Sequence, residues 1–244
     1  MVTKSATGWV DTFDGDGIHS DEWGIKRKLS DSGYLDIISG PFQQQFDTEI
    51  MDRFKWPDGK DPGRVSGMRE RVMKLKQETD YVVILYVFGG FTTISMFLRG
   101  FEGWFMDLVT REPLLSELLD HTLKFHMDST EAALEAVGTD VDIVAFADDY
   151  ADQRGLMFSP KHFRKLIKPR LAKLFDKVRE KSHAKILLHS CGAVSDILED
   201  FIEIGVDALN PIQVRAANMN PEILKKKFGD RICFWGGIDT QQVL

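Results

Sequence analysis

The residues most able to do chemistry in this chain stand where predicted strands end. His189 and Cys191 lie two positions apart on an extended segment, so both side chains point to the same side. An imidazole and a thiol on one face are a natural pair of zinc ligands, because zinc takes nitrogen and sulfur donors. Zinc needs three or four ligands, and this spacing supplies two. The alternative interpretation is that His189 is a histidine at a strand end and Cys191 a small buried thiol, without a metal.

An acidic cluster follows the predicted strand 142–147. Asp148 and Asp149 come directly after this strand, and Asp152 stands three residues further on. Carboxylates held close together have pKa values that are pushed apart, which suits general acid–base catalysis or contact with a cationic group. Asp148 and Asp149 are therefore the candidate catalytic residues. A solvated turn is the alternative, and it is favoured for Asp152.

Neutral polar groups and glycines at other strand ends suit the binding of a substrate. Amide side chains hydrogen-bond a polar molecule without adding charge, and glycines let a ligand approach the backbone closely. The expected substrate-binding residues are Gly90, Phe91, Asn210, Gln213 and Asp239. Ordinary glycine turns and the capping of a loop by Asn210 are the alternatives.

These groups must be positioned by regular secondary structure. From residue 66 onward the sequence predicts strands and helices in regular alternation. Short apolar strands there alternate with longer helices, and this order is typical of a parallel sheet with helical crossovers. The predicted strands are 81–88, 142–147, 185–190, 206–209 and 231–235, and the predicted helices are 68–79, 92–107, 113–135, 160–181, 194–204 and 221–228. Ahead of them, residues 33–40 alternate like a short strand, and residues 12–21 read as a polar loop.

The alternation favours an α/β fold of the (β/α)8 TIM-barrel type. No glycine-rich dinucleotide or phosphate-binding fingerprint follows any strand, which argues against a Rossmann domain. A closed barrel needs eight strands, so either the barrel is incomplete or the first third of the chain supplies strands that the pattern hides. We expect a single barrel domain over residues 1–244, with an irregular part at 1–65 and β/α repeats at 66–244.

Composition excludes several classes of protein. The net charge of −7 argues against nucleic acid as a partner, and two cysteines rule out a disulfide scaffold. Residues 81–98 carry no charge, but Gly89 and Gly90 interrupt them, which favours a strand, a turn and a helix over a membrane span. The N-terminus has no apolar signal segment, so we expect a cytoplasmic protein without a membrane partner.

Together these strand ends resemble the uroporphyrinogen decarboxylase superfamily. The resemblance runs through Asp21-Glu-Trp-Gly and Gly89-Gly-Phe-Thr, then through FADDYADQRGLMFSPKHFRKLIKPRLAKLF, LLHSCGAVSDILEDFIEIGVDALNPIQ and FGDRICFWGGIDTQQVL. It covers most of the chain from about residue 20 onward. The resemblance implies a distorted (β/α)8 barrel, usually a homodimer, that acts on a small molecule.

Two chemistries are implied by this resemblance. Uroporphyrinogen decarboxylase removes acetate carboxyls from a tetrapyrrole in porphyrin and heme biosynthesis, without a cofactor. The related corrinoid-dependent methyltransferases use zinc, held by a His-x-Cys pair and a distant third Cys, to activate a thiol that takes a methyl group from a methylcorrinoid protein. His189-Ser190-Cys191 matches the first part of the zinc pattern, and the decarboxylase signature Arg-Gln-Ala-Gly-Arg is absent. The methyltransferase branch is therefore favoured.

The resemblance also has departures. By this resemblance the third zinc cysteine would lie beyond Leu244 and the family's opening segment is missing, so we expect a truncated barrel. Cys233 is an alternative third ligand. On this hypothesis zinc lies on His189 and Cys191. The residues expected to orient the substrate are Asp149, Asn210, Gln213 and Asp239. The alternatives are a cofactor-free decarboxylase, with an acidic group near Asp149 facing the pyrrole nitrogens, and an inactive fragment that only binds a partner.

Overall fold

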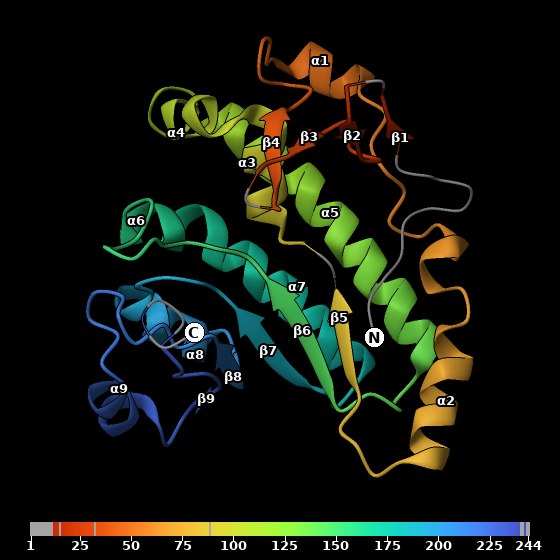
Figure 1. Ribbon diagram of the computed structural model, residues 1–244, viewed down its shortest axis with the longest axis vertical. Helices are drawn as coiled ribbons and strands as arrows, with labels where there is room; N and C mark the ends of the chain where they lie inside the picture. Colours follow the sequence, from red (N-terminus) through yellow and green to blue (C-terminus); the bar gives the residue numbers. More distant parts are fainter. Residues whose placement is uncertain (1–11, 15, 32, 88, 240–241, 243–244) are drawn as a thin grey trace. The chain divides into compact units, whose positions relative to one another are not determined.

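The computed structural model describes residues 12–14, 16–31, 33–87, 89–239 and 242 (Figure 1). Within these residues the chain forms two compact units. The first unit contains the described residues between Gly67 and Gly90 and those from Ala133 onward, and the second contains the described residues up to Ser66 and Phe91–Ala132. The helix α5 (Glu112–Val137) begins in the second unit, and its last residues belong to the first.

A parallel sheet forms the centre of the first unit. Its strands are β5 (Ile84–Val87), β6 (Ile143–Ala147), β7 (Lys185–His189), β8 (Ala208–Asn210) and β9 (Cys233–Phe234). All neighbours are parallel and follow chain order, with β5 and β9 at the edges. Parallel neighbours in chain order are the arrangement of a β/α barrel wall.

The two faces of this sheet differ in burial. Leu85, Val144 and Leu188 point to one face and are fully buried. Tyr86 and His189 point to the other face and are half-buried. Because side chains alternate along a strand, the second face is where polar groups at the strand ends remain accessible to a ligand.

Helices of the first unit precede β5 and connect β6 to β7, β7 to β8 and β8 to β9, whereas the chain from β5 to β6 passes through the second unit. They are α2 (Met68–Glu78), α6 (Pro160–His162), a π-helical turn (Phe163–Ile167), α7 (Lys168–Lys181), a 3-10 turn (Ser195–Ile197), α8 (Leu198–Glu203) and α9 (Pro221–Phe228). Ser159 caps the helical segment 160–181 by accepting a hydrogen bond from the His162 N–H, as its position before Pro160 predicts. Phe175 of α7 packs on Phe146 of β6 with ring centroids 5.5 Å apart.

The second unit combines a small antiparallel sheet with helices. The strands are β1 (Thr12–Phe13), β2 (Ile18–Ser20), β3 (Lys26–Leu29) and β4 (Leu35–Ser39), and the helices are α1 (Thr48–Arg53), a 3-10 turn (Pro62–Val65), α3 (Phe91–Arg99), α4 (Phe101–Thr110) and most of α5. The strand predicted at 33–40 is confirmed. The first third of the chain does supply further strands, but they pair antiparallel among themselves and do not extend the parallel sheet.

Two expectations about single elements were wrong. Residues 12–21 are a hairpin rather than a loop, because Asp14 Oδ1 accepts hydrogen bonds from the N–H groups of Asp16 and Ile18 and so closes a tight turn. The helix predicted at 92–107 is two helices. Gly100 adopts φ +77° between them, a left-handed conformation that ends α3 and that other residues rarely take.

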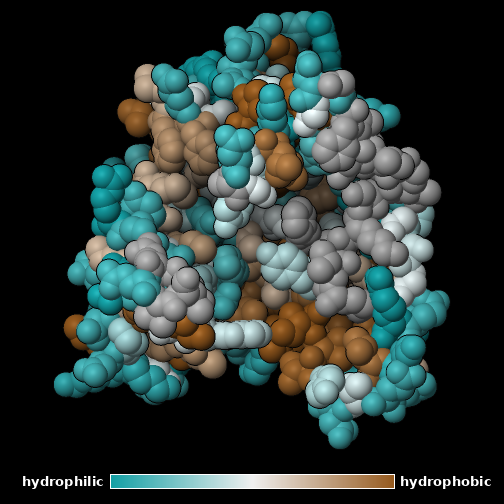
Figure 2. All heavy atoms as spheres, viewed as in Figure 1, coloured by the Kyte–Doolittle hydropathy of each residue, from teal (hydrophilic) through white to brown (hydrophobic). Residues whose placement is uncertain are grey.

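The predicted fold class is confirmed: the chain is an α/β protein whose five described parallel strands form an incomplete barrel of the TIM type. Among the described helices none is long and apolar enough to cross a bilayer. On the face that Figure 2 draws, hydrophilic residues surround smaller hydrophobic patches.

Candidate metal centre

Three side chains that carry zinc-ligand atoms meet at the carboxyl ends of β6 and β7. His189 is the last residue of β7, Cys191 follows two residues later, and Asp149 stands two residues after the end of β6. One ligand atom from each lies within 4.8 Å of the others, and all three residues are half-buried. His189 Nε2 is 3.4 Å from Cys191 Sγ, so the two side chains do lie on the same side. We call these three residues the ligand cluster.

Parallel pairing brings the cluster together across 42 positions of sequence. Ala147 pairs with His189 in register, which places the residues after β6 beside the residues after β7. The Cys191 N–H then donates to Asp149 Oδ1 at 2.8 Å. Gly192 turns the chain directly afterwards with φ +87°, and a Cβ at this position would lie 2.5 Å from the carbonyl oxygen of Asp152. A side chain at this position would collide with the backbone of Ala151 and Asp152, so the turn beside Cys191 requires glycine.

The electrostatic environment of the cluster favours a cation. Burial, and then the negative charge of Asp149, raise the pKa of the Cys191 thiol to about 11. Burial and the same carboxylate also raise the pKa of the Tyr86 phenol on β5. A divalent cation would offset the charge of the carboxylate and stabilise a thiolate beside it. Imidazole nitrogen, thiol sulfur and carboxylate oxygen are all zinc ligands, so the donor set fits this metal.

Of the two amide residues predicted after β8, Asn210 contacts the cluster and Gln213 contacts the turn that follows it. Asn210 Oδ1 lies 2.8 Å from His189 Nδ1. Gln213 Oε1 accepts a hydrogen bond from the Gly192 N–H at 3.0 Å and another from Gln153 Nε2. These amides therefore support the cluster residues and the turn that follows them.

The two adjacent aspartates after β6 lie in different surroundings. Asp148 is buried and accepts a hydrogen bond from the Tyr150 hydroxyl at 3.1 Å, whereas Asp149 contacts Cys191. Gly90 lies directly against Asp148, since a Cβ on Gly90 would stand 2.2 Å from the Asp148 carboxyl carbon. Gly90 thus provides the space that the Asp148 carboxylate occupies.

The remaining predicted site residues lie elsewhere among the described residues. Asp239 forms an ion pair with Arg215 at 2.6 Å and accepts a hydrogen bond from the Gln242 N–H. Phe91 begins α3 in the second unit and is buried. Cys233 on β9 is exposed and does not belong to the ligand cluster, where Asp149 stands as the third group.

Sequence reasoning did not single out Tyr86 and Gln153. Tyr86 is hidden within an apolar strand, although period-two alternation places it on the same face of the sheet as His189. Gln153 contacts Gln213 across 60 positions, and no local pattern carries that information.

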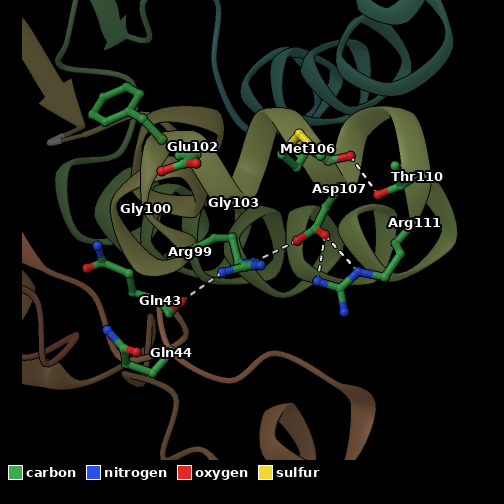
Figure 3. Close-up of a pocket in the computed structure, with 11 residues that line it drawn as sticks. Gln43, Gln44, Arg99, Gly100, Glu102, Gly103, Met106, Asp107, Thr110 and Arg111 are labelled. Atoms are coloured by element: carbon green, nitrogen blue, oxygen red, sulfur yellow. Dashed lines mark hydrogen bonds and ion pairs between the residues drawn. The ribbon is translucent and has the colours of Figure 1, made fainter.

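A separate polar pocket of about 480 Å³ lies in the second unit, next to α4. Figure 3 shows Asp107 between two guanidinium groups. Asp107 Oδ2 accepts from Arg99 Nε, and Asp107 Oδ1 accepts from Arg111 Nε, each at 2.7 Å. The carbonyl oxygen of Gln43 accepts from Arg99 as well, at 3.0 Å. We call Arg99 and Arg111 the arginine pair, and these two residues together with Asp107 the Asp107 cluster.

Comparison with known proteins adds a family and a structural neighbour. Residues 38–244 match the model of the family described as uroporphyrinogen decarboxylase (URO-D). Among solved structures, a methyltransferase from Methanosarcina mazei is similar with a TM-score of 0.61 and 21% sequence identity, over 86% of this chain and 58% of that one. The present chain thus spans less than two thirds of this neighbour, and the likeness concerns the fold. No curated protein sequence matches the chain.

Proposed function

Because the chain belongs to the uroporphyrinogen decarboxylase family, we propose that it is a zinc-dependent methyltransferase that moves a methyl group from a methylcorrinoid protein to a thiol. The observation that carries this proposal is the ligand cluster of Asp149, His189 and Cys191, whose ligand atoms lie within 4.8 Å of one another. Cofactor-free decarboxylation gives no reason to gather a thiol and an imidazole at this place. The methyltransferase fold of the structural neighbour is consistent with the proposal.

The residues of the chain divide into ligands and supports. His189, Cys191 and Asp149 would hold the metal through one nitrogen, one sulfur and one oxygen atom, which leaves a position for a substrate, as in catalytic zinc sites. Zinc held there would supply a lowered pKa to an acceptor thiol, so that a thiolate would be available near neutral pH. The electron pair of the acceptor sulfur would form the bond to the methyl carbon, and the pair of the broken cobalt–carbon bond would stay with the corrinoid.

Other side chains orient the substrate in this proposal. Tyr86 lies on the same face of the sheet as His189 and is close enough to Asp149 to feel its charge, so its phenol is a donor at the edge of the cluster. Gln213 holds the Gly192 turn and keeps Cys191 in place. The wider substrate site is proposed to include Gly90 and Asp239, which belong to the same unit as the ligand cluster. Asp148 is buried, and it is proposed to act indirectly, by fixing the position of the loop that carries both aspartates.

The biological setting belongs to the same proposal. A methylcorrinoid protein is the proposed partner and methyl donor, and a small thiol is the proposed acceptor. The family resemblance further suggests a homodimer in the cytoplasm. Nucleic acid is not a proposed partner, because the chain carries a net charge of −7.

Zinc content of the purified chain tests the proposal first. After metal loading and removal of loose metal, we expect about one zinc per chain in the wild type and none in His189→Ala or Cys191→Ala. The matched controls are His183→Ala and Cys233→Ala, since both replace exposed residues of the same two types outside the cluster. Both controls should retain zinc.

Turnover assays then separate the chemistries. Zinc-loaded wild type should transfer the methyl group of methylcobalamin to a small alkyl thiol, and neither His189→Ala nor Cys191→Ala should do so above background. A folded wild type without zinc contradicts the proposal. Release of carbon dioxide from uroporphyrinogen by the metal-free chain would support the decarboxylase instead.

A further inference from the structure

Asn210 connects the ligand cluster to the last strand of the sheet. It ends β8 and stands in register with His189 on β7. Its Oδ1 lies 2.8 Å from His189 Nδ1, and its Nδ2 donates to the carbonyl oxygen of Trp235 at 3.2 Å. Both ends of the amide are therefore engaged by the protein itself.

The contact with Trp235 decides which way the amide faces. A backbone carbonyl can only accept a hydrogen bond, so the NH₂ end of Asn210 must point toward Trp235. The Trp235 carbonyl is in turn fixed by its residue's own N–H, which donates to the Leu209 carbonyl at 2.9 Å. The oxygen end of Asn210 is consequently directed at His189, and it can only accept.

The orientation of Asn210 then decides which nitrogen of His189 carries the proton. A neutral imidazole has one N–H, and the acceptor at 2.8 Å from Nδ1 places it on that nitrogen. Nε2 is left with a lone pair, and it points to the side of Cys191 Sγ, 3.4 Å away.

We propose that Asn210 is a positioning residue that holds His189 in the Nδ1–H tautomer, so that Nε2 is ready to ligate zinc. This inference rests on the proposed function, and it gives Asn210 a role toward His189 in place of direct substrate binding. Metal-bound histidines commonly donate their second N–H to an acceptor of this kind, and loss of such an acceptor weakens metal binding about 10- to 100-fold.

The tautomer is measured directly in the metal-free protein by long-range ¹H–¹⁵N correlation spectra of labelled histidine at about pH 8, where imidazole is mainly neutral. The signals of His189 are those absent from His189→Gln. In the wild type we expect a protonated Nδ1 and an unprotonated Nε2. In Asn210→Leu, which removes the acceptor at similar size, we expect the Nε2–H form to become populated, and zinc affinity to fall by about 10- to 100-fold.

Two further variants separate positioning from simple destabilisation. Asn210→Asp keeps an acceptor for Nδ1–H, so it should retain the wild-type tautomer and recover zinc affinity relative to Asn210→Leu. Asn220→Leu removes the cap of α9 in the same unit without touching His189, and it should leave both readouts unchanged.

Either of two results would overturn the inference. One is an Asn210→Leu protein with the wild-type tautomer, and the other is a changed tautomer with unchanged zinc affinity. Because the spectra need no metal, failure of this inference differs from failure of the proposed function, in which the wild type itself binds no zinc.

Discussion

Asp149 in the first unit and Asp107 in the second are both carboxylates within polar clusters, but the two clusters differ in charge. The neighbours of Asp107 are cationic, whereas those of Asp149 are a thiol, an imidazole and a backbone N–H. The arginine pair donates to both oxygens of Asp107, so the negative charge is balanced within the protein. Asp149 accepts a hydrogen bond from the backbone N–H of Cys191 and lies next to a thiol and an imidazole. Burial is the main cause of the raised pKa values of Cys191 and Tyr86, and the charge of Asp149 raises both further.

The contrast separates a cluster whose charges balance within the protein from one that we propose to bind a cation. Guanidinium groups remain charged at all relevant pH values, so the Asp107 cluster is complete without a ligand. The groups around Asp149 become a stronger donor set when a cation replaces the thiol proton. A group of polar side chains that meet at one place is therefore a weak indication of metal binding, and the chemical types of the neighbouring groups are the reason for proposing a metal at Asp149 and not at Asp107.

Replacing Asp107 should produce the largest change in stability. Asp107→Asn keeps the shape of the side chain but leaves two guanidinium groups without their shared charge, and we expect a loss of about 3 kcal/mol in the free energy of unfolding. Urea denaturation measures this loss. Glu49→Gln is the control, because Glu49 pairs with Arg53 on an exposed helix surface, and it should change stability by less than about 0.5 kcal/mol. Equal effects of the two substitutions would contradict a structural role for the arginine pair.

The reactivity of Cys191 should show the next largest effect. In Cys233→Ala the only thiol is Cys191, whose pKa of about 11 leaves little thiolate near pH 8 in the metal-free protein. Alkylation by iodoacetamide should be roughly 100-fold slower in the folded chain than in the same chain unfolded by urea, where the thiol pKa is about 8.5. The folded rate should keep rising above pH 9. Asp149→Asn should speed the reaction, and an unchanged rate would show that Asp149 does not act on this thiol.

Removing the charge of Asp149 should weaken metal binding more moderately. Asp149→Asn retains an oxygen that can accept the Cys191 N–H, so the loop should keep its conformation while the anionic ligand is lost. We expect zinc affinity to fall by at least about 10-fold, measured by competition with a chromophoric chelator. Asp152→Asn is the matched control, since Asp152 is exposed, lies outside the ligand cluster and should bind zinc as the wild type does. Equal affinities in the two variants would remove Asp149 from the set of ligands.

Local patterns in the sequence predicted the parts of this molecule that depend on neighbouring residues. Ser159 and Pro160 mark the start of a helix because a hydroxyl cap and a fixed φ act within one turn. His189 and Cys191 share a side because a strand repeats every two residues. The wrong expectation at 12–21 has a similar origin, since β1 and β2 have two and three residues and are too short to show a period.

Contacts between distant segments could not be predicted in this way. Asp149 was identified as a candidate catalytic residue, but its hydrogen bond to the Cys191 N–H depends on the register of β6 and β7. Asn210 was expected to bind substrate, and its contact with His189 follows from the pairing of β7 and β8. Register is set by packing over the whole sheet, so a single sequence reveals the ligand types more readily than their arrangement.

Replacing Asp200 on α8 should have a smaller effect on stability than replacing Asp107. Asp200 also pairs with two cations, Arg164 and Lys168, but these are on average more exposed than the two arginines around Asp107. Burial by itself raises the pKa of Asp200, but hydrogen bonds from Arg164 and Lys168 outweigh burial, and the pKa is lowered. The ion pairs therefore stabilise the fold above the unfolded-state pKa of about 3.9, and this contribution is lost as pH falls through the lower folded-state value.

We therefore expect Asp200→Asn to lower the free energy of unfolding by about 1 kcal/mol at pH 7, less than Asp107→Asn does, because Arg164 is half-exposed and solvent screens the pair. Urea denaturation between pH 7 and pH 3 measures the difference between wild type and variant, which should shrink below about pH 4. A difference that stays constant over this range would mean that the charge of Asp200 contributes nothing and that only its hydrogen bonds matter. An effect as large as that of Asp107→Asn would mean that exposure of the cations does not separate the two clusters.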